Sequence, residues 1–225
     1  MTNRRDFFKT STAFGLGAAL TSACSVAENA TAMSVFDAIQ KRRSVRKFKD
    51  TPVPEEHLTK IIDAARMAPT SGNQQPWKFL IIRDRRKLNQ LKEACIQRSI
   101  DRFKENKNPS EEELAKRKES TSEYYNNILS APVYVVVLVD MKSKWPTYNR
   151  HDGPMGALSL MLAARALGYG TVYFTDSIPD DVTREVLEIP EQYERMCITP
   201  IGVPDKWPET PEKKPLEDFI VYEKF

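Results

Sequence analysis

Residues 68–79 read APTSGNQQPWKF, and this stretch decides how the chain folds. Pro69 lacks an N–H and the small polar side chains of residues 70–72 compete for the backbone, so we expect a turn here and not a helix interior. The amides of residues 73–75 then stand at the entrance of an apolar strand, 79–82, where they suit the polar edge of a flat heterocycle. Taken alone, the stretch is equally typical of a helix-to-strand loop closed by a packing tryptophan.

A second stretch upstream, residues 42–48, reads RRSVRKF. Five of the seven residues in 41–47 are Lys or Arg, and Ser44 interrupts them. Guanidinium forks and a hydroxyl are the groups that bind a cluster of phosphate oxygens. A charge run of this kind is also typical of a solvated face.

Together and in this order, RRSVRKF and APTSGNQQPW resemble the nitroreductase family of FMN-dependent oxidoreductases. The likeness continues through GALSLMLAARALGYGTVYFT at 156–175 and the closing blocks at 200–204 and 213–217, so it covers the chain after residue 33. It implies an α+β fold with a central mixed, mainly antiparallel sheet flanked by helices, in an intertwined homodimer. The alternation of helical and strand patterns with short links also predicts a mixed sheet flanked by helices.

The resemblance implies a role for each residue of the two blocks. Arg42, Arg43 and Ser44 would hold the FMN phosphate and ribityl chain, with Arg46 beside the flavin pyrimidine. Lys213 occupies a position where the family commonly has Arg. Lysine keeps the positive charge but cannot bind the phosphate through two parallel N–H groups, as arginine does. The cofactor-binding residues expected in this way are Arg42, Arg43, Ser44, Arg46, Pro69, Thr70, Ser71, Asn73, Gln75, Tyr173, Phe174, Thr175, Lys213 and Lys214.

Residues 173–175 are expected to act through backbone N–H groups near flavin N5. The charged segment 101–125 would cover the open flavin face, with Tyr124 and Tyr125 as candidate cover residues. Because the flavin carries the chemistry, no protein side chain is expected to act as a catalytic acid or base.

These features predict an FMN-dependent oxidoreductase. It would accept hydride from NAD(P)H and pass it to a small-molecule electron acceptor such as a nitroaromatic or a quinone. Two alternatives stay open. One is a relative that performs reductive dehalogenation or oxygen-dependent flavin cleavage, and the other is an exported flavin-binding electron carrier without its own substrate.

Residues 1–32 are expected to be an export signal, and residues 33–225 are expected to form the FMN-binding domain. NRRDFFK at 3–9 resembles a twin-arginine export signal, and the apolar run 10–23 is shorter than the ~20 residues that span a bilayer. Two processing outcomes compete: lipidation at Cys24, or cleavage after Ala32. The protein would be carried by the twin-arginine export machinery and would lie in the periplasm or be lipid-anchored at the outer face of the membrane. NAD(P)H is scarce there, so the physiological donor stays open.

The composition excludes other classes. The 34 basic and 31 acidic residues nearly balance, so nothing points to nucleic acid. Three cysteines without a CxxC motif, and only two histidines, predict no metal site. For Cys95 and Cys197, buried free thiols are favoured over a disulfide.

Overall fold

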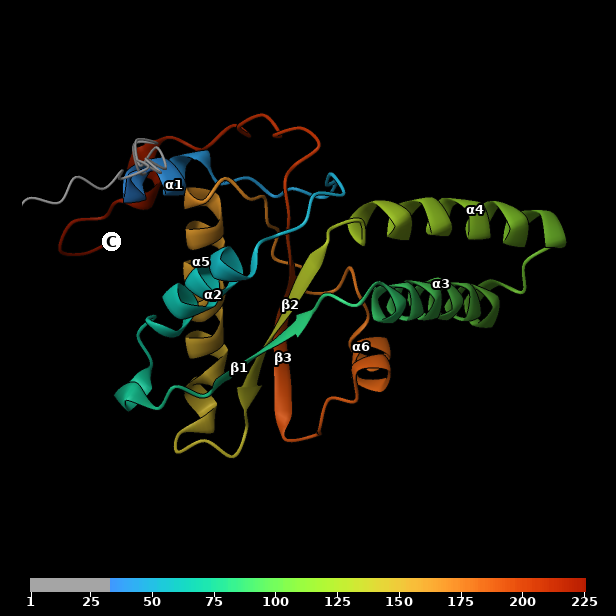
Figure 1. Cartoon of the computed structure of the whole chain (residues 1–225), viewed down its shortest axis with the longest axis horizontal. Coiled ribbons are helices and arrows are strands. Elements are labelled where there is room, and N and C mark those ends of the chain that lie inside the picture. Colours follow the sequence, from blue (N-terminus) through green and yellow to red (C-terminus); the bar gives the residue numbers. More distant parts are fainter. Residues whose placement is uncertain (1–32) are drawn as a thin grey trace, which may run out of the picture. The chain divides into compact units, whose positions relative to one another are not determined.

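The computed structural model describes residues 33–225, apart from the side chain of Asn106, and the expectations for the export signal and Cys24 lie outside this range. Along the chain, each strand follows a pair of α-helices (Figure 1). The helices are α1 Val35–Lys41, α2 Glu55–Arg66, α3 Arg85–Lys107, α4 Glu111–Ile128, α5 Asn149–Ala166 and α6 Asp180–Leu187. The strands are β1 Trp77–Ile82, β2 Val133–Asp140 and β3 Tyr193–Ile201, and short 3-10 turns cover η1 Ser71–Asn73, η2 Pro146–Tyr148 and η3 Leu216–Phe219.

The central sheet is mixed and mainly antiparallel, as the resemblance implies. Its strands lie in the order β1-β2-β3, and both neighbouring pairs are antiparallel. The segment 170–174 extends the sheet beyond β3 through antiparallel bridges of Gly170 to Gly202 and Phe174 to Ile198. A parallel bridge between Ser44 and Thr171 then brings the basic block to this edge.

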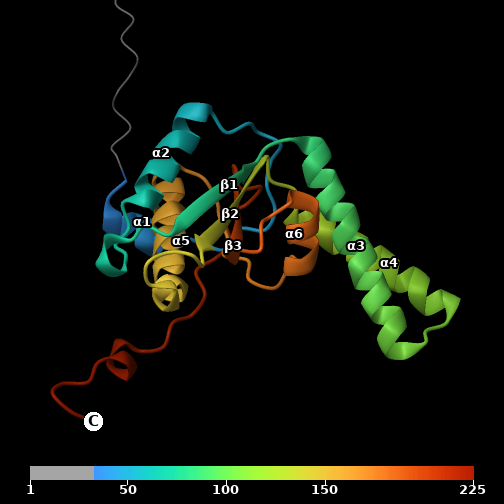
Figure 2. The same ribbon diagram turned by 90° about the horizontal axis from the view of Figure 1, so that it is seen from below.

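Helices cover both faces of the sheet (Figure 2). In β2, successive side chains point to opposite faces. Val133 and Val135 join a core cluster with residues of α2 and α5, whereas Tyr134, Val136 and Leu138 join a cluster with residues of α3 and α6. The uninterrupted apolar run of β2 is therefore explained by burial on both faces.

Local sequence signals account for several helix ends. Ser34 caps α1, the Ser110–Glu113 capping box starts α4, and Gly168 follows α5 with φ of 88°. Helix α5 begins at Asn149, so the proline at residue 154 lies inside it. Proline favours the first turn of a helix, but here the buried Asn149 amide donates to the Asp140 carbonyl at 2.9 Å and fixes an earlier start.

Large apolar surfaces stay uncovered. On α1 only Ala38 is buried, and Phe36 is 77% exposed. The C-terminal segment after Asp205 carries exposed apolar side chains, including Phe219 and Tyr222. No helix within residues 33–225 is long and apolar enough to cross a membrane.

Candidate functional site

A basic cavity of about 900 Å³ lies between the end of α1 and the C-terminal segment. Arg42, Arg43, Ser44 and Arg46 line it from one side, and Lys213 lines it from the other. The structure thus brings together predicted phosphate ligands about 170 residues apart in sequence. Lys214 is not part of the lining.

Three residues around this cavity escaped the sequence analysis. Arg165 at the end of α5 donates from Nε to the Lys41 carbonyl at 3.0 Å, and its guanidinium lies 4.0 Å from the centre of the Trp207 ring. Burial, together with the nearby Arg43 charge, lowers the pKa of Arg165. Arg43 in turn donates to the Thr210 hydroxyl. Only the fold brings these three residues to the basic block, and no motif marks them.

From this cavity the edge segment 170–174 leads to the residues expected near flavin N5. Val45 N–H donates to the Thr171 carbonyl at 2.9 Å, so the basic block and this segment lie side by side. Phe174 N–H donates to the Ile198 carbonyl at 3.0 Å, so the expectation that Phe174 offers a free backbone donor is wrong. Within residues 33–225, the N–H groups of Tyr173 and Thr175 have no acceptor.

The loop 68–76 is held by the first turns of α5. Ser71 donates to Asp152 Oδ1 from both its backbone N, at 3.0 Å, and its hydroxyl, at 3.2 Å. Gln74 Nε2 donates to the other carboxylate oxygen at 2.7 Å. Beside this anchor, Pro69, Asn73 and Gln75 are exposed. Gln75 donates from its backbone N to the Thr70 hydroxyl at 3.1 Å and from Nε2 to Asn73 Oδ1 at 3.2 Å.

Within one protomer, the basic block 42–48 lies far from the loop block 68–79. The basic block contacts Arg165 near one end of α5, and Ser71 contacts Asp152 near the other end. Thirteen residues separate these anchors on α5, which is about 20 Å along a helix axis. Figure 1 shows α1 and η1 beside opposite ends of α5. The predicted phosphate ligands and the predicted ring ligands therefore do not form one site within one copy.

The comparison with known families decides the assignment. Residues 39–203 match the model described as "Nitroreductase family". The chain belongs to the nitroreductase family.

Relatives of this nitroreductase-family protein carry more than one activity name. A protein of Methanothermobacter thermautotrophicus, provisionally named an NADH dehydrogenase/NAD(P)H nitroreductase, is 31% identical over 79% of this chain and 81% of its own. Iodotyrosine deiodinase of Thermotoga neapolitana is 30% identical over 83% of this chain and 96% of its own. A crystal structure of oxidized iodotyrosine deiodinase bound to FMN and 3-iodo-L-tyrosine superposes with a TM-score of 0.67 at 26% identity, covering 85% of this chain and all of that one.

Residues 101–125, the segment predicted as a substrate cover, form the end of α3 and most of α4, and these two helices lie antiparallel. Tyr125 is buried there, and its ring meets the half-exposed Tyr124 ring edge-on at 5.2 Å. Burial raises the pKa of Tyr125 to about 12, so its hydroxyl keeps its proton at neutral pH.

The cysteines of the described chain are buried free thiols, as favoured from the sequence. Burial raises the pKa of the Cys197 thiol to about 12. No group of three or more His, Cys, Asp or Glu within residues 33–225 could hold a metal ion.

Proposed function

We propose that this protein is an FMN-dependent oxidoreductase that moves hydride from a reduced nicotinamide to a small organic acceptor. One observation carries the proposal: the fold places Lys213 in the same cavity as Arg42, Arg43 and Ser44. Membership of the nitroreductase family supports it, as does the FMN-bound structure of a relative.

The residues present fit FMN. Guanidinium, ammonium and hydroxyl groups suit a phosphate, and the cavity volume lies in the range of small-molecule sites. Beyond the phosphate ligands, the edge segment 171–175 continues away from Ser44 and offers the free N–H groups of Tyr173 and Thr175. We assign these two N–H groups to the N5 edge of the flavin and Arg46 to its pyrimidine edge.

A second copy of the chain completes the proposed site. The Ser71 loop of one protomer would meet the basic cavity of its partner, because the two lie about 20 Å apart within one copy. The exposed apolar side chains of α1 and of the C-terminal segment provide surface for such an intertwined homodimer. Obligate dimer interfaces are rich in apolar surface of this kind.

Bound FMN would supply the redox chemistry, accepting a hydride and passing it on. Two-electron reduction of a nitroaromatic consumes one hydride and one proton and yields a nitroso group and water. The protein binds and orients the cofactor, supplies positive charge at its phosphate and pyrimidine ends, and covers its open face with α3–α4. A quinone is a second suitable acceptor.

Reductive dehalogenation is a second candidate reaction. The likeness to iodotyrosine deiodinase over 83% of this chain favours it. Halide release from a halophenol, followed with an ion-selective electrode, distinguishes the two reactions.

We also propose that residues 1–32 direct export by the twin-arginine route, which carries folded, cofactor-loaded proteins. The mature protein would then lie in the periplasm or be lipid-anchored through Cys24. NAD(P)H is scarce there, so the physiological donor of the exported protein stays open, and a carrier role for the flavin would follow if no nicotinamide reduces it.

The deciding experiment adds NADPH, then NADH, anaerobically to the FMN-reconstituted protein while the flavin absorbance is followed. Rapid bleaching supports a nicotinamide-driven reductase. A bound flavin that stays oxidised contradicts the nicotinamide donor and favours the carrier function. Failure to retain FMN overturns the proposal as a whole.

A further inference from the structure

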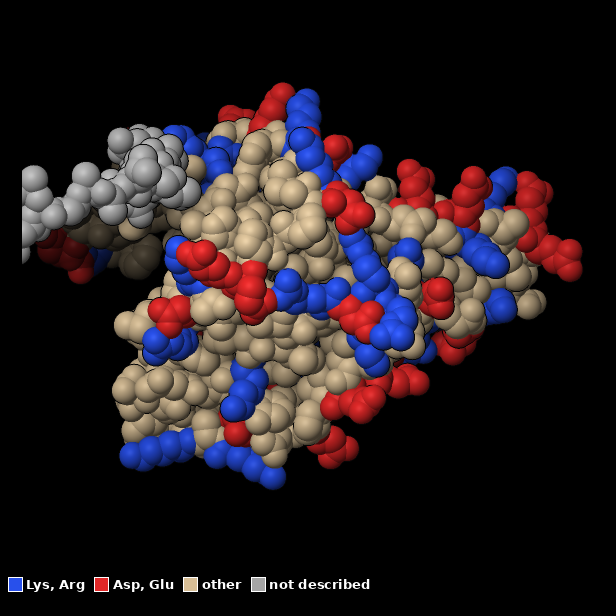
Figure 3. Space-filling view, in the orientation of Figure 1, with Lys and Arg blue, Asp and Glu red and all other residues tan. Residues whose placement is uncertain are grey.

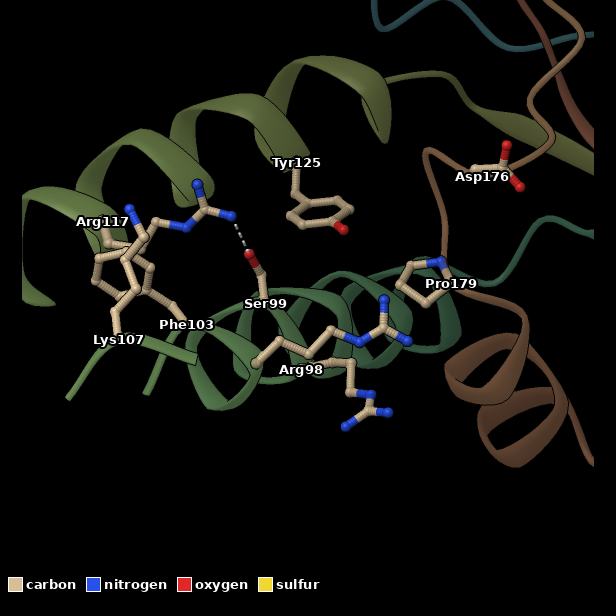
Figure 4. Close-up of a pocket in the computed structure, with 9 residues that line it drawn as sticks. Arg98, Ser99, Phe103, Lys107, Arg117, Tyr125, Asp176 and Pro179 are labelled. Carbon is tan, nitrogen blue, oxygen red and sulfur yellow. Dashed lines mark hydrogen bonds between the residues drawn. The ribbon is translucent and has the colours of Figure 1, made fainter. Parts of the chain in front are cut away.

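A second basic pocket, of about 430 Å³, opens between α3, α4 and the loop before α6 (Figure 4). Its cations are Arg98, Arg102, Lys107 and Arg117, and its rings are Phe103 and Tyr125. Asp176 is its one lining carboxylate. Positively charged side chains bind the anionic group of a ligand, and aromatic side chains pack against its ring, so this lining suits an aromatic anion.

The positive charge of this pocket is only partly neutralised. Asp181 lies outside the lining and accepts from Arg98 Nε at 2.7 Å, with Arg102 at 3.9 Å from the same carboxylate oxygen. Lys107 and Arg117 have no carboxylate within ion-pair distance in the part of the chain described. The pocket therefore carries an excess of positive charge. Figure 3 shows both charge signs mixed on the face in view.

The Arg117 side chain is aimed into the pocket. Its Nη2 donates to the Ser99 hydroxyl at 3.0 Å, and its guanidinium carbon lies 5.6 Å from the centre of the Phe103 ring. Figure 4 shows Arg117 reaching from α4 towards α3, with the Tyr125 ring further along the same gap. The Tyr125 hydroxyl has no partner within residues 33–225 and remains a donor.

The pocket borders the proposed flavin site. Asp176, in its lining, directly follows Thr175, whose N–H we assign to the flavin N5 edge. Arg195 holds the segment 175–178 in place, because its guanidinium donates to the Thr175 carbonyl at 2.9 Å and to the Ile178 carbonyl at 2.8 Å. A molecule held between α3 and α4 would thus lie next to the reacting end of the cofactor.

We propose that this pocket is the acceptor site and that it selects a small aromatic anion, such as an aromatic carboxylate. Arg117 binds the anionic group, Lys107 adds attraction, and Phe103 and Tyr125 pack against the ring. This inference rests on the proposed function, since the acceptor must receive hydride from the flavin. It specifies that the substrate of the proposed reaction is negatively charged and contains an aromatic ring.

The test compares 4-nitrobenzoate with its neutral counterpart 4-nitrobenzamide in the full-length, FMN-loaded protein. We expect Arg117→Gln to lower the ratio of their kcat/KM values about fivefold, the upper range for an exposed charge pair. Lys118→Gln is the matched control, because it removes one cation from the neighbouring exposed position of α4, outside the pocket. Arg117→Lys should retain part of the preference.

A second measurement avoids turnover. Calorimetric titration with benzoate and benzamide should show preferential benzoate binding that weakens as salt increases and is lost in Arg117→Gln. Equal binding of the two, or an unchanged ratio in Arg117→Gln, overturns the pocket assignment while leaving flavin reduction by nicotinamide intact. Loss of flavin with benzoate binding retained would instead overturn the proposed function.

Discussion

Asp152 accepts two hydrogen bonds from Ser71, through the backbone N at 3.0 Å and through the hydroxyl at 3.2 Å. The Asp152 side chain is only 4% exposed and also accepts from Gln74. The loop that it holds has left-handed backbone at Gly72, Asn73 and Gln75, with φ of 56°, 54° and 49°. Such backbone persists only when its surroundings hold it in place.

We therefore expect Asp152→Ala to loosen the loop 68–76. The loss of three hydrogen bonds to a buried carboxylate should lower the free energy of unfolding by about 2–4 kcal/mol. Urea denaturation followed by circular dichroism measures this loss. Asp63→Ala, which removes only an exposed pair with Arg66, should cost less than about 1 kcal/mol. Equal losses in the two variants would show that the buried network does not stabilise the loop.

The phosphate assignment predicts a difference between FMN and riboflavin, which lacks the phosphate. Replacing Arg42 and Arg43 together with Ala should weaken FMN binding roughly 100-fold, because two charge-assisted interactions with the phosphate are lost. Riboflavin binding should change little. Fluorescence titration with both flavins measures the ratio, and Arg86→Ala, at a 90% exposed side chain outside the cavity, is the control. A double variant that prefers FMN over riboflavin as strongly as the wild type does would contradict the phosphate assignment.

The resemblance to the family predicted both sides of the basic cavity, residues 42–44 and Lys213. Local patterns predicted the turn at 69–72 and the strand at 79–82, because turn chemistry and apolar runs act over a few residues. They could not show that Ser71 is bound by Asp152, 81 residues away, or that Arg165 stacks on Trp207. Those contacts depend on how α5 lies against the rest of the domain. Phe36 on α1 follows a helical pattern yet is exposed, since periodicity cannot tell whether a face is buried within one chain or against another.

The proposed homodimer predicts that the exposed face of α1 is covered in solution. Phe36→Asp places a charge on that face and should shift the protein from dimer to monomer at micromolar concentration, with loss of bound FMN. Sedimentation velocity and the flavin-to-protein absorbance ratio measure the two effects. Gln90→Asp, which adds the same charge to exposed α3 surface, should leave both unchanged. A wild-type protein that is a stable FMN-bound monomer would contradict the shared site.

The buried thiol of Cys197 predicts a dependence of stability on alkaline pH. Burial raises its pKa from the reference value of 9.0 to about 12, so the folded state keeps a proton that the unfolded state loses. The stabilising contribution is fully present below pH 9 and is lost as the pH rises towards about 12. Cys197→Ala should flatten this part of the curve of unfolding free energy against pH. Thiol labelling at neutral pH should modify Cys197 only after denaturant is added, and rapid labelling of the native protein would contradict its burial.

The export proposal predicts that the arginine pair, and not charge alone, directs the protein out of the cytoplasm. Replacing Arg4 and Arg5 together with Lys keeps both charges but removes both guanidinium groups, so the protein should be retained in the cytoplasm of a host with twin-arginine export. Cell fractionation with an FMN fluorescence readout measures this retention.

Cys24→Ala separates the two processing outcomes: a membrane-bound wild type that becomes soluble in this variant indicates lipidation. A wild type that is already soluble with its N-terminus near Met33 indicates cleavage after Ala32, and export that persists in the double Lys variant would rule out the twin-arginine route.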